Sequence, residues 1–452
     1  MTAVAILGLG ASGHAAALLA LHNGDHVHVS DRSTDPRAAA RAADLRTLGA
    51  TVELGRHDVA RIAAADTVVV SPGIPPDAPV LRELHARGVR WISEPEFAFR
   101  FFKGPLIAVT GTNGKTTTCV LADHLLRAGG VRSALGGNLG GGLGPAASEL
   151  ALLDPPPAWY VLEMSSFQLA DMDTLRPDIG VVTALAPDHL DRYPDVAAYY
   201  ADKARLFRNA DDASRWVLNG EDPAVEALAG DASGRRFRFA VDPREGVHAF
   251  LRGGVLTLRT GREEEPLIPN GELPLLGRHN VLNALAAALV ARLAGVEPAA
   301  IAHGLRTARP LPHRLEPVVE RGGVLWVNDS KATNIAAAVS AVLSLERPLV
   351  LLVGGKDKGE ELGPLAEAAQ GRVRVAICFG AAGPRMWAAL GGARVPVVGP
   401  EAGLAQAVAA ARRAARAGDA VLLAPACSSF DEFRDYQERG ERFRALARDE
   451  AA

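Results

Sequence analysis

Short apolar segments rich in Val, Ile and Leu alternate with Ala-, Leu- and Arg-rich stretches along most of the chain. The apolar segments have the length of buried strands and the longer stretches that of helices, an alternation typical of parallel α/β sheets. The first 94 residues are predicted to contain strands at Val4–Leu7, Val27–Ser30, Thr67–Val70 and Trp91–Ile92. The following segment, Glu94–Pro105, is expected to be a hinge or linker.

The middle of the chain begins with an apolar strand at Leu106–Val109, and further buried strands are expected near Trp159–Leu162 and Gly180–Ala184. Between residues 235 and 277 the pattern changes to short alternating segments separated by Gly, which predicts a small antiparallel sheet. A helix is expected from about 280 to 293. Three prolines in TARPLPHRLEP then mark a boundary near residue 310.

The last part of the chain returns to the first pattern. It is predicted to contain a long helix around 402–416 and strands at Val324–Val327, Leu349–Val353, Val373–Phe379 and Ala420–Leu423. A length of 452 residues suggests about three domains. We therefore predict an α/β protein with domains at 1–94, 95–310 and 311–452.

Composition narrows the class of protein. The net charge of −3 and the 5% aromatic content give no electrostatic or stacking argument for a nucleic acid or an anionic membrane as partner. The three cysteines are far apart, which favours neither a disulfide framework nor a zinc site and fits a reducing cytoplasm. The first residues, MTAVAILGLG, lack the basic leader of a secretory signal, and no apolar run is long enough to span a bilayer. We expect a cytoplasmic monomer.

Lysine is scarce: the 49 basic residues comprise 43 arginines and six lysines, at positions 103, 115, 203, 331, 356 and 358. Arginine replaces lysine on most solvated surfaces, but not where a compact ammonium contacts phosphate or an amine must react. The six lysines are therefore candidates for chemical roles. For each lysine the alternative is that it was retained by chance and has no chemical role.

The strongest motif is IAVTGTNGKTTT, residues 107 to 118, in which a buried strand, a Gly-rich turn and a helix follow one another. Such a turn surrounds an anion with backbone N–H groups and a helix N-terminus. Lys115 is expected to contact the β- and γ-phosphates of a nucleotide, and the Thr116 hydroxyl to bind Mg²⁺. The loop, Gly111-x-x-Gly114-Lys115-Thr116, is shorter than the usual P-loop because Val109 stands in place of its first Gly.

Three later residues are candidates for metal binding. Glu163 ends the apolar strand in AWYVLEMSSFQL, where a carboxylate beside a P-loop binds Mg²⁺. His189, in APDHLDRYP, follows a predicted strand at the sheet edge where ligands bind in such folds. Lys203 has Tyr199 and Phe207 as helix neighbours, so its amine is expected to be desolvated, neutral and able to add CO₂ as a carbamate. The alternative interpretations are that Glu163 is a buried structural residue, that His189 is an ordinary loop histidine and that Lys203 is solvated.

The motifs TGTNGKTTT, EMSSFQL, DHLDRYP, LPHR and NDSKATN, in this order, resemble those of the Mur ligase family, ATP-dependent amide-forming enzymes of peptidoglycan synthesis. Asn113, the absence of a DNPR motif and the presence of an N-terminal block bring the chain nearest to the members that add D-glutamate to UDP-N-acetylmuramoyl-L-alanine. The resemblance implies a Rossmann-like N-terminal domain, a central P-loop ATPase domain with a mixed sheet, and a Rossmann-like C-terminal domain. It further implies ATP and two Mg²⁺ ions, with UDP-N-acetylmuramoyl-L-alanine and D-glutamate as substrates.

The resemblance also assigns roles residue by residue. It implies one Mg²⁺ at Thr116 and Glu163 and the other at His189 and a carbamylated Lys203, with Lys115, His189, Lys203 and Lys331 as catalytic residues. ATP would be bound by Gly111, Thr112, Asn113, Gly114, Lys115, Thr116, Thr117, Asn283, Arg314 and Asp329. Asn138 would contact the UDP-sugar substrate, and glutamate would be bound by Thr333, Lys358, Ser429 and Tyr436.

The motif GLGASG, residues 8 to 13, opens a near-complete dinucleotide fingerprint, because Asp31 lies 18 residues beyond Gly13. Alone it would favour an NAD-dependent oxidoreductase, but 94 residues are too few for two mononucleotide-binding halves. One half holds a single diphosphate, such as the UDP of a UDP-sugar. Its pyrophosphate is expected at Ser12, and its uracil near Asp31, Arg32, Ser71 and Gly73.

Two alternatives stay open beside the oxidoreductase: a ligase of this family with another acceptor, such as L-glutamate, and a nucleotide-binding regulator without catalysis. The candidate residues Lys115, Glu163, His189 and Lys203 argue against the regulator. The sequence departs from the family at Arg32–Ser33, usually Thr-Arg, and at Phe430 and Tyr436, usually Leu and Phe.

Overall fold

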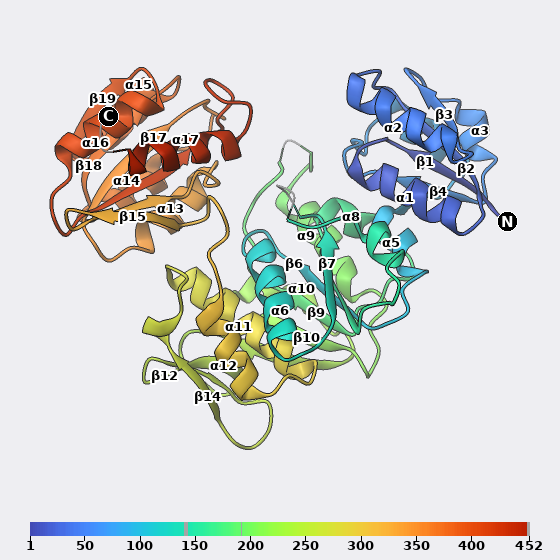
Figure 1. The fold of residues 1–452 in the computed structure, drawn as a ribbon, viewed down its shortest axis with the longest axis horizontal. Coiled ribbons are helices and arrows are strands. Elements are labelled where there is room, and N and C mark those ends of the chain that lie inside the picture. The colour runs from blue at the N-terminus through green and yellow to red at the C-terminus, as the bar shows by residue number, and fades with distance from the viewer. Residues whose placement is uncertain (140–142, 191, 450–452) are drawn as a thin grey trace. The chain divides into compact units, whose positions relative to one another are not determined.

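The computed structural model describes residues 1–139, 143–190 and 192–449. The chain forms two compact units, one of residues 1–270 with 282–306 and the other of residues 271–281 with 307–452. Within the described residues the strands form three sheets, built from residues 3–93, 106–269 and 316–426 (Figure 1). The α/β class and the mixed central sheet predicted above are confirmed. The boundaries at 94 and 310 stay predictions.

The N-terminal sheet has the order β3-β2-β1-β4-β5, and all its pairings are parallel. Its strands are β1 (Ala3–Leu7), β2 (His26–Asp31), β3 (Thr51–Leu54), β4 (Thr67–Val70) and β5 (Ile92–Ser93). Side chains alternate across the sheet: Val4 and Ile6 join the core under helix α1 (Ala11–His22), whereas Ala5 and Leu7 pack with the other helical layer. The remaining helices are α2 (Pro36–Thr47), α3 (Val59–Ala63) and α4 (Pro79–Ala86).

The segment expected as a linker contains a buried helix, α5 (Glu94–Phe99). The Glu96 carboxylate, fully buried, accepts hydrogen bonds from the backbone N–H groups of Asp173, Thr174 and Leu175. Three donors on one carboxylate compensate its desolvation. The expectation of a hinge is therefore wrong for Glu94–Phe99, which is bound to the middle of the chain.

The central sheet has the order β14-β13-β12-β11-β10-β9-β6-β8-β7. Its strands are β6 (Leu106–Thr110), β7 (Ser133–Gly137), β8 (Trp159–Glu163), β9 (Ile179–Val182), β10 (Arg215–Asn219), β11 (Arg235–Phe239), β12 (Val247–Arg252), β13 (Val255–Leu258) and β14 (Glu265–Pro269). The helices of this region are α6 (Lys115–Ala128), α7 (Ala147–Ala151), α8 (Ser166–Ala170), α9 (Val196–Ala204), α10 (Pro223–Ala229), α11 (Arg278–Leu293) and α12 (Pro298–Thr307).

The separate antiparallel sheet expected between 235 and 277 is only partly correct. The hairpins β12–β13 and β13–β14 are antiparallel, but β11 pairs in parallel with both β10 and β12 and so extends the central sheet. The alternating pattern identified the strands, whereas their direction depends on a crossover through α10 that sequence alternation does not report.

The C-terminal sheet has the order β15-β16-β20-β17-β18-β19, with β15 antiparallel and the rest parallel. Its strands are β15 (Glu316–Arg321), β16 (Val324–Asn328), β17 (Leu349–Gly354), β18 (Val373–Phe379), β19 (Val397–Glu401) and β20 (Ala420–Ala426). The helices α13 (Ile335–Leu343), α14 (Gly363–Ala369) and α15 (Gly383–Gly392) share one core; α16 (Leu404–Ala414) and α17 (Tyr436–Arg448) share the other. The fully buried β17 reads LVLLVG, an uninterrupted apolar run, because both its faces are covered.

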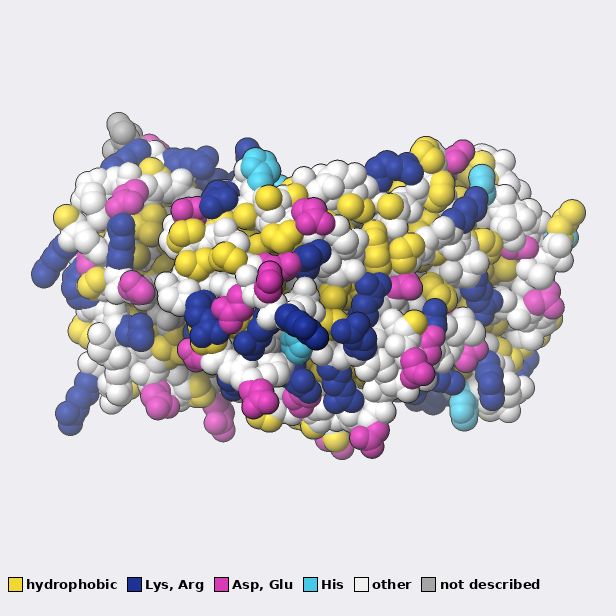
Figure 2. Space-filling view, turned by 90° about the horizontal axis from the view of Figure 1, so that it is seen from below, with side chains coloured by type: hydrophobic (Ala, Val, Ile, Leu, Met, Phe, Trp, Pro, Cys, Tyr) yellow, Lys and Arg dark blue, Asp and Glu magenta, His cyan; other side chains and the backbone are white. Residues whose placement is uncertain are grey.

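The surface carries acidic and basic side chains interspersed on the face that Figure 2 presents. Many of the described arginines pair with carboxylates, such as Arg252 with Glu264 and Arg385 with Asp357. Among the described residues, every helix is too short or too polar to span a bilayer.

Candidate active site

The phosphate loop lies where β6 ends and α6 begins, as the motif predicts. Gly114 has φ +88°, and a Cβ there would lie 2.5 Å from the Asn283 Oδ1 atom, so the position requires glycine. Thr183 fixes the loop by donating its hydroxyl to the Asn113 carbonyl oxygen at 2.6 Å. Lys115 is the first residue of α6. The loop therefore directs a helix N-terminus toward the carboxyl edge of the central sheet.

Two lysine amines converge on this loop. Lys115 Nζ donates to the carbonyl oxygens of Gly111 and Thr112 at 3.0 and 2.8 Å. Lys203 Nζ, brought by α9 from 92 residues away, donates to the same Gly111 oxygen at 2.8 Å. Two amines therefore meet at one carbonyl of the loop, and the Lys115 ammonium provides a positive charge that suits a polyphosphate.

The Lys203 side chain is 1% exposed, and its Nζ lies 4.6 Å from the centre of the Tyr199 ring. Burial lowers the pKa of Lys203 to about 6, and the nearby charge of Lys115 acts in the same direction. The amine is therefore mostly neutral at pH 7 to 8. A neutral amine is nucleophilic, as addition of CO₂ requires.

A hydroxyl, a carboxylate and an amide meet beside the loop. Thr116 Oγ1 donates to Glu163 Oε2 at 2.6 Å, and Asn138 Nδ2 donates to Glu163 Oε1 at 3.2 Å. Glu163 is 3% exposed at the end of β8. Mg²⁺ typically takes one or two carboxylates and completes its shell with water and phosphate oxygens. The Thr116 and Glu163 oxygens fit such a site, and their role in binding Mg²⁺ stays a prediction.

His189 lies on the loop after β9 with φ +55°, an uncommon conformation for a side-chain-bearing residue. Its ring packs edge-on against Phe167 and Tyr199, with centroids 5.2 and 5.9 Å away. Because Lys203 contacts the same tyrosine, the two predicted ligands of the second metal share one aromatic neighbour. Among the described residues no cluster of three His, Cys, Asp or Glu side chains suits a metal. The second metal site stays a prediction.

The other predicted nucleotide contacts of this region surround the loop. Thr112 Oγ1 donates to the Ala186 carbonyl at 3.0 Å and lies 3.2 Å from the Tyr199 hydroxyl. Thr117 is buried in the first turn of α6. Asn283, predicted to contact the purine, sits on α11 against α6, with its Oδ1 accepting from Thr118 Oγ1 at 3.4 Å. Its contact with a purine stays a prediction.

A separate cavity of about 900 Å³ opens at the carboxyl ends of β1, β2 and β4. It is lined by all five residues predicted to hold the UDP group: Ser12, Asp31, Arg32, Ser71 and Gly73. The helix α1 begins beside it, and Gly13 permits this approach because a Cβ there would overlap the Gly8 carbonyl oxygen. Asp31 accepts from the backbone N–H groups of Leu9 and Ser33, which holds its carboxylate at the rim.

The second unit holds the remaining predicted residues on loops at the carboxyl edge of its sheet. Asp329 follows β16, and its Oδ1 accepts from the Leu315 N–H at 3.2 Å. Burial raises its pKa to about 7, although that hydrogen bond and the charge of Arg314 favour the ionised form. Asp329 and Arg314 are thus neighbours in space, and their contacts with ATP stay predictions.

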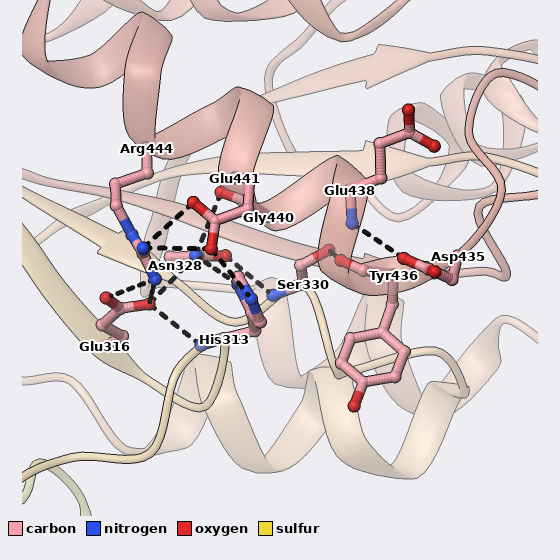
Figure 3. A network of polar contacts seen from close by, with 10 residues as sticks. All are labelled: His313, Glu316, Asn328, Ser330, Asp435, Tyr436, Glu438, Gly440, Glu441 and Arg444. Atoms are coloured by element: carbon pink, nitrogen blue, oxygen red, sulfur yellow. Dashed lines mark hydrogen bonds and ion pairs between the residues drawn. The ribbon is translucent and has the colours of Figure 1, made fainter. Parts of the chain in front are cut away.

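Lys331 is half-buried, and its Nζ lies 4.0 Å from the centre of the Tyr436 ring. The Lys331 N–H donates to the His313 carbonyl, and the Tyr436 carbonyl accepts from Ser330 Oγ at 2.8 Å. In Figure 3 the Tyr436 ring points away from the polar network around Asn328. The aromatic face therefore positions the Lys331 amine, and the phenol group lies apart from the network.

The three other predicted glutamate contacts differ in burial. The Thr333 N–H donates to the Lys331 carbonyl at 2.8 Å, so these two residues are adjacent. Ser429 is 2% exposed. Lys358 is exposed on the loop after β17. Lys356, which had no assigned role, pairs with Ser428 through backbone hydrogen bonds and so joins the loops after β17 and β20.

Two arginines that the sequence analysis passed over hold loops near the candidate residues, Arg439 in the second unit and Arg192 in the first. The Arg439 guanidinium, 1% exposed, donates to the carbonyl oxygens of Ser330, Cys427 and Ser428. Arg192 stacks on Phe167 at 3.9 Å and donates to the carbonyls of Pro72 and Ile74. Arginine is common in this chain, so neither position carried a signal that sequence alone would reveal.

Comparison with known proteins decides the family. Three family models match in succession: a MurD-like N-terminal domain of Mur ligases at residues 2–93, a Mur ligase middle domain at 109–291, and a Mur ligase glutamate ligase domain at 313–427. The chain is 41% identical to UDP-N-acetylmuramoylalanine–D-glutamate ligase of Acidobacterium capsulatum over 98% of this chain and 95% of that protein. The chain belongs to the Mur ligase family. The resemblance in the sequence motifs is confirmed.

The fold of this Mur ligase is similar to that of solved structures. The chain matches UDP-N-acetylmuramate–alanine ligase of Thermotoga maritima with a TM-score of 0.59 over 98% of each chain, at 20% identity. It matches E. coli FolC, solved with DHPP and ADP, with a TM-score of 0.57 over 78% of this chain and 91% of that one, at 20% identity. Members of the family use ATP and Mg²⁺. The GLGASG motif lies within the MurD-like domain, so it no longer favours an oxidoreductase.

Proposed function

We propose that this Mur ligase adds D-glutamate to UDP-N-acetylmuramoyl-L-alanine in an ATP-dependent reaction of peptidoglycan precursor synthesis. The observation that carries the proposal is the 41% identity, over 98% of the chain, to a ligase named for that reaction. The cavity beside GLGASG supports it, because a helix N-terminus next to a large pocket suits the pyrophosphate of a UDP-sugar.

The chemistry follows from the groups at the loop. The substrate carboxylate attacks the γ-phosphorus of ATP, forming an acyl phosphate and releasing ADP. Mg²⁺, when bound at Thr116 and Glu163, neutralises phosphate charge. Lys115 stabilises the charge that spreads over the transferring phosphoryl group, and Arg314 is assigned the same role. The glutamate amine then attacks the acyl carbonyl, forms the amide bond and expels phosphate.

The amino-acid side of the reaction is assigned to the second unit. Thr333, Lys358, Ser429 and Tyr436 would bind glutamate. Lys331 would lie near the reacting groups, and Asp329 would hold the ATP ribose. Their position on loops at the carboxyl edge of a parallel sheet supports this, since ligands bind there in such folds. An acyl phosphate hydrolyses in water, so ligation requires that the site exclude solvent before the phosphoryl group is transferred.

The assay is phosphate release from ATP with Mg²⁺ and UDP-N-acetylmuramoyl-L-alanine while the amino acid is varied. We expect release that depends on D-glutamate and yields an amide-linked product detectable by mass spectrometry. Faster turnover with L-glutamate would overturn the assignment of the acceptor. No release with any amino acid would overturn the ligase itself.

Lys203 is proposed to act as a carbamate. Its neutral amine adds CO₂, forms an N–C bond and loses a proton, which leaves an anionic oxygen ligand near His189. The burial of Lys203 and its lowered pKa support this, and arginine has no comparable chemistry. The carbamate would hold the second Mg²⁺ together with His189.

The carbamate is tested by comparing Lys203→Ala with Lys203→Arg. Both should lower phosphate release at least a hundredfold, and formate or acetate should restore part of the activity of Lys203→Ala only, because arginine fills the space. Wild-type protein in ¹³C-bicarbonate should show a carbamate carbon resonance that both variants lack. Full activity of either variant, or the same resonance in Lys203→Ala, would contradict the proposal.

A further inference from the structure

The cavity of the N-terminal sheet contains an imidazole to which no motif or comparison assigns a role. His57 lines this cavity on the turn between β3 and α3. The turn is attached to the neighbouring strand, because the Gly55 N–H donates to the Asp31 carbonyl at 2.8 Å. His57 therefore has a defined position relative to Asp31, one strand further from the GLGASG loop.

The hydrogen bonds of His57 determine which ring nitrogen carries the proton. Its Nδ1 lies 2.6 Å from Ser30 Oγ, and the same hydroxyl donates to the Arg56 carbonyl at 3.1 Å. Ser30 is fully buried and has a single hydroxyl proton. Both bonds form only if the hydroxyl donates to Arg56 and Nδ1–H donates to Ser30. Nε2 is then an acceptor.

The Nε2 atom has no hydrogen-bond partner in the described part of the protein, and the ring is half-buried. Since Nδ1 faces the buried Ser30, the opposite side of the ring lines the cavity. Burial lowers the pKa of His57, with Arg32 acting in the same direction and Asp31 and Glu53 opposing it. The imidazole is thus neutral near pH 7, and its lone pair is available to a ligand donor.

The order of the strands indicates which part of a nucleotide reaches this atom. A diphosphate at the start of α1 lies over the end of β1, and the ends of β2 and β3 are about 5 and 10 Å further along the sheet. The nucleoside therefore extends toward Asp31 and then His57. Uracil presents one N–H donor on its imide edge, at N3, whereas cytosine has an acceptor there.

We propose that His57 is a specificity-determining residue that accepts a hydrogen bond from uracil N3–H through Nε2. This inference rests on the proposed UDP-sugar substrate and adds a contact that selects the base. The Asp31 carboxylate accepts two backbone hydrogen bonds, from Leu9 and Ser33, which fix its orientation.

The test compares His57→Asn with wild type in calorimetric binding of UDP and of 3-methyl-UDP at pH 8. The Asn amide nitrogen takes the place of Nδ1 and keeps the bond to Ser30, but nothing replaces Nε2. We expect UDP to bind the variant about tenfold more weakly, the loss of one hydrogen bond. The affinity for 3-methyl-UDP, which lacks the proton, should be the same in both proteins.

His26→Asn is the matched control, because His26 is exposed at the opposite end of β2 and lies outside the cavity. It should leave both affinities unchanged. With UDP-N-acetylmuramoyl-L-alanine, whose pyrophosphate diester does not titrate near pH 6, wild-type affinity should fall as His57 gains a proton below pH 6.5. The affinity of His57→Asn should not change over that range.

The outcomes separate this inference from the proposed function. Equal weakening of UDP and 3-methyl-UDP by His57→Asn, or no weakening of either, would overturn the uracil contact and leave the ligase proposal intact. A loss seen with UDP but absent with 2′-deoxy-UDP would assign His57 to the ribose and also overturn the contact. Failure of wild type to bind any uridine nucleotide would refute the UDP-sugar site itself.

Discussion

The lysines of the first unit and those of the second unit are held in different ways. Lys115 and Lys203 both donate to the Gly111 carbonyl, in a loop fixed by Thr183 and by a helix N-terminus. Lys331 lies over the Tyr436 ring, as Lys203 lies near the Tyr199 ring, and Lys358 is exposed. The proposed phosphate-binding side is thus organised by the backbone of one strand–helix junction. The proposed amino-acid side depends on side chains from separate loops, so its geometry depends on the packing among those loops.

The largest expected difference between the two sides is their tolerance of arginine. Lys115→Arg should lower ATP-dependent phosphate release about a thousandfold, because a planar guanidinium does not fit between the Gly111 and Thr112 carbonyls. Lys331→Arg should lower it about tenfold or less, because arginine also stacks on an aromatic face.

The control for this comparison is Lys356→Arg, whose backbone, rather than its amine, pairs with the neighbouring loop. It should retain activity within about twofold. The KM values for ATP and D-glutamate should be measured for each variant. Equal losses of phosphate release in Lys115→Arg and Lys331→Arg would show that both positions require lysine to the same degree, which would contradict the predicted difference between the two sides.

A second expected difference concerns stability. Lys203 has a pKa of about 6 in the folded protein against an ordinary value of 10.5, so folding releases a proton between these values. At pH 7.5 this costs about 2 to 4 kcal/mol. Lys203→Met should therefore increase the free energy of unfolding by about that amount while abolishing activity. Because the unfolded chain binds more protons, the gain should shrink as pH rises toward 10.

Lys358→Met, at an exposed position, should leave the free energy of unfolding within about 0.5 kcal/mol of wild type. Denaturant unfolding at pH 7.5, 8.5 and 9.5 measures the free energy of unfolding of wild type, Lys203→Met and Lys358→Met. A Lys203→Met gain that does not change with pH would show that lost packing strain, rather than proton release, explains it. Added bicarbonate should reduce the difference in free energy of unfolding between Lys203→Met and wild type if it carbamylates Lys203 in the wild type.

The structure brings candidate residues of the first unit together. Thr116 and Asn138, from separate segments, both donate hydrogen bonds to Glu163. These residues meet because parallel strands end at one edge of the sheet and bring their terminal residues together. In the second unit the sequence suggested ligand contacts but did not identify the residues that hold the loops in place. Arg439 is one of 43 arginines in the sequence, and only the structure shows that it is buried and donates to three carbonyls.

Two local patterns were misread for related reasons. The alternation between 235 and 277 identified strands but not the parallel pairing of β11, since direction depends on the crossover that precedes it. The segment Glu94–Phe99 resembled a linker because its Glu and Pro residues are usually exposed. The carboxylate of Glu96 is instead buried against three backbone donors supplied from residues 173–175.

The sequence by itself determined the family, many of the buried strands and the position of the Gly-rich loop after β6, because these depend on local patterns and on motifs that lie in short segments. It missed β3, β7, β10, β15 and β19. The tertiary structure alone decided which groups share an environment. The pKa of Lys203 depends on the depth of its burial and on Lys115, 88 positions earlier. The role inferred for His57 depends on Ser30, a neighbour through the sheet. Desolvation and hydrogen bonding act through space, and the linear order of residues does not contain those distances.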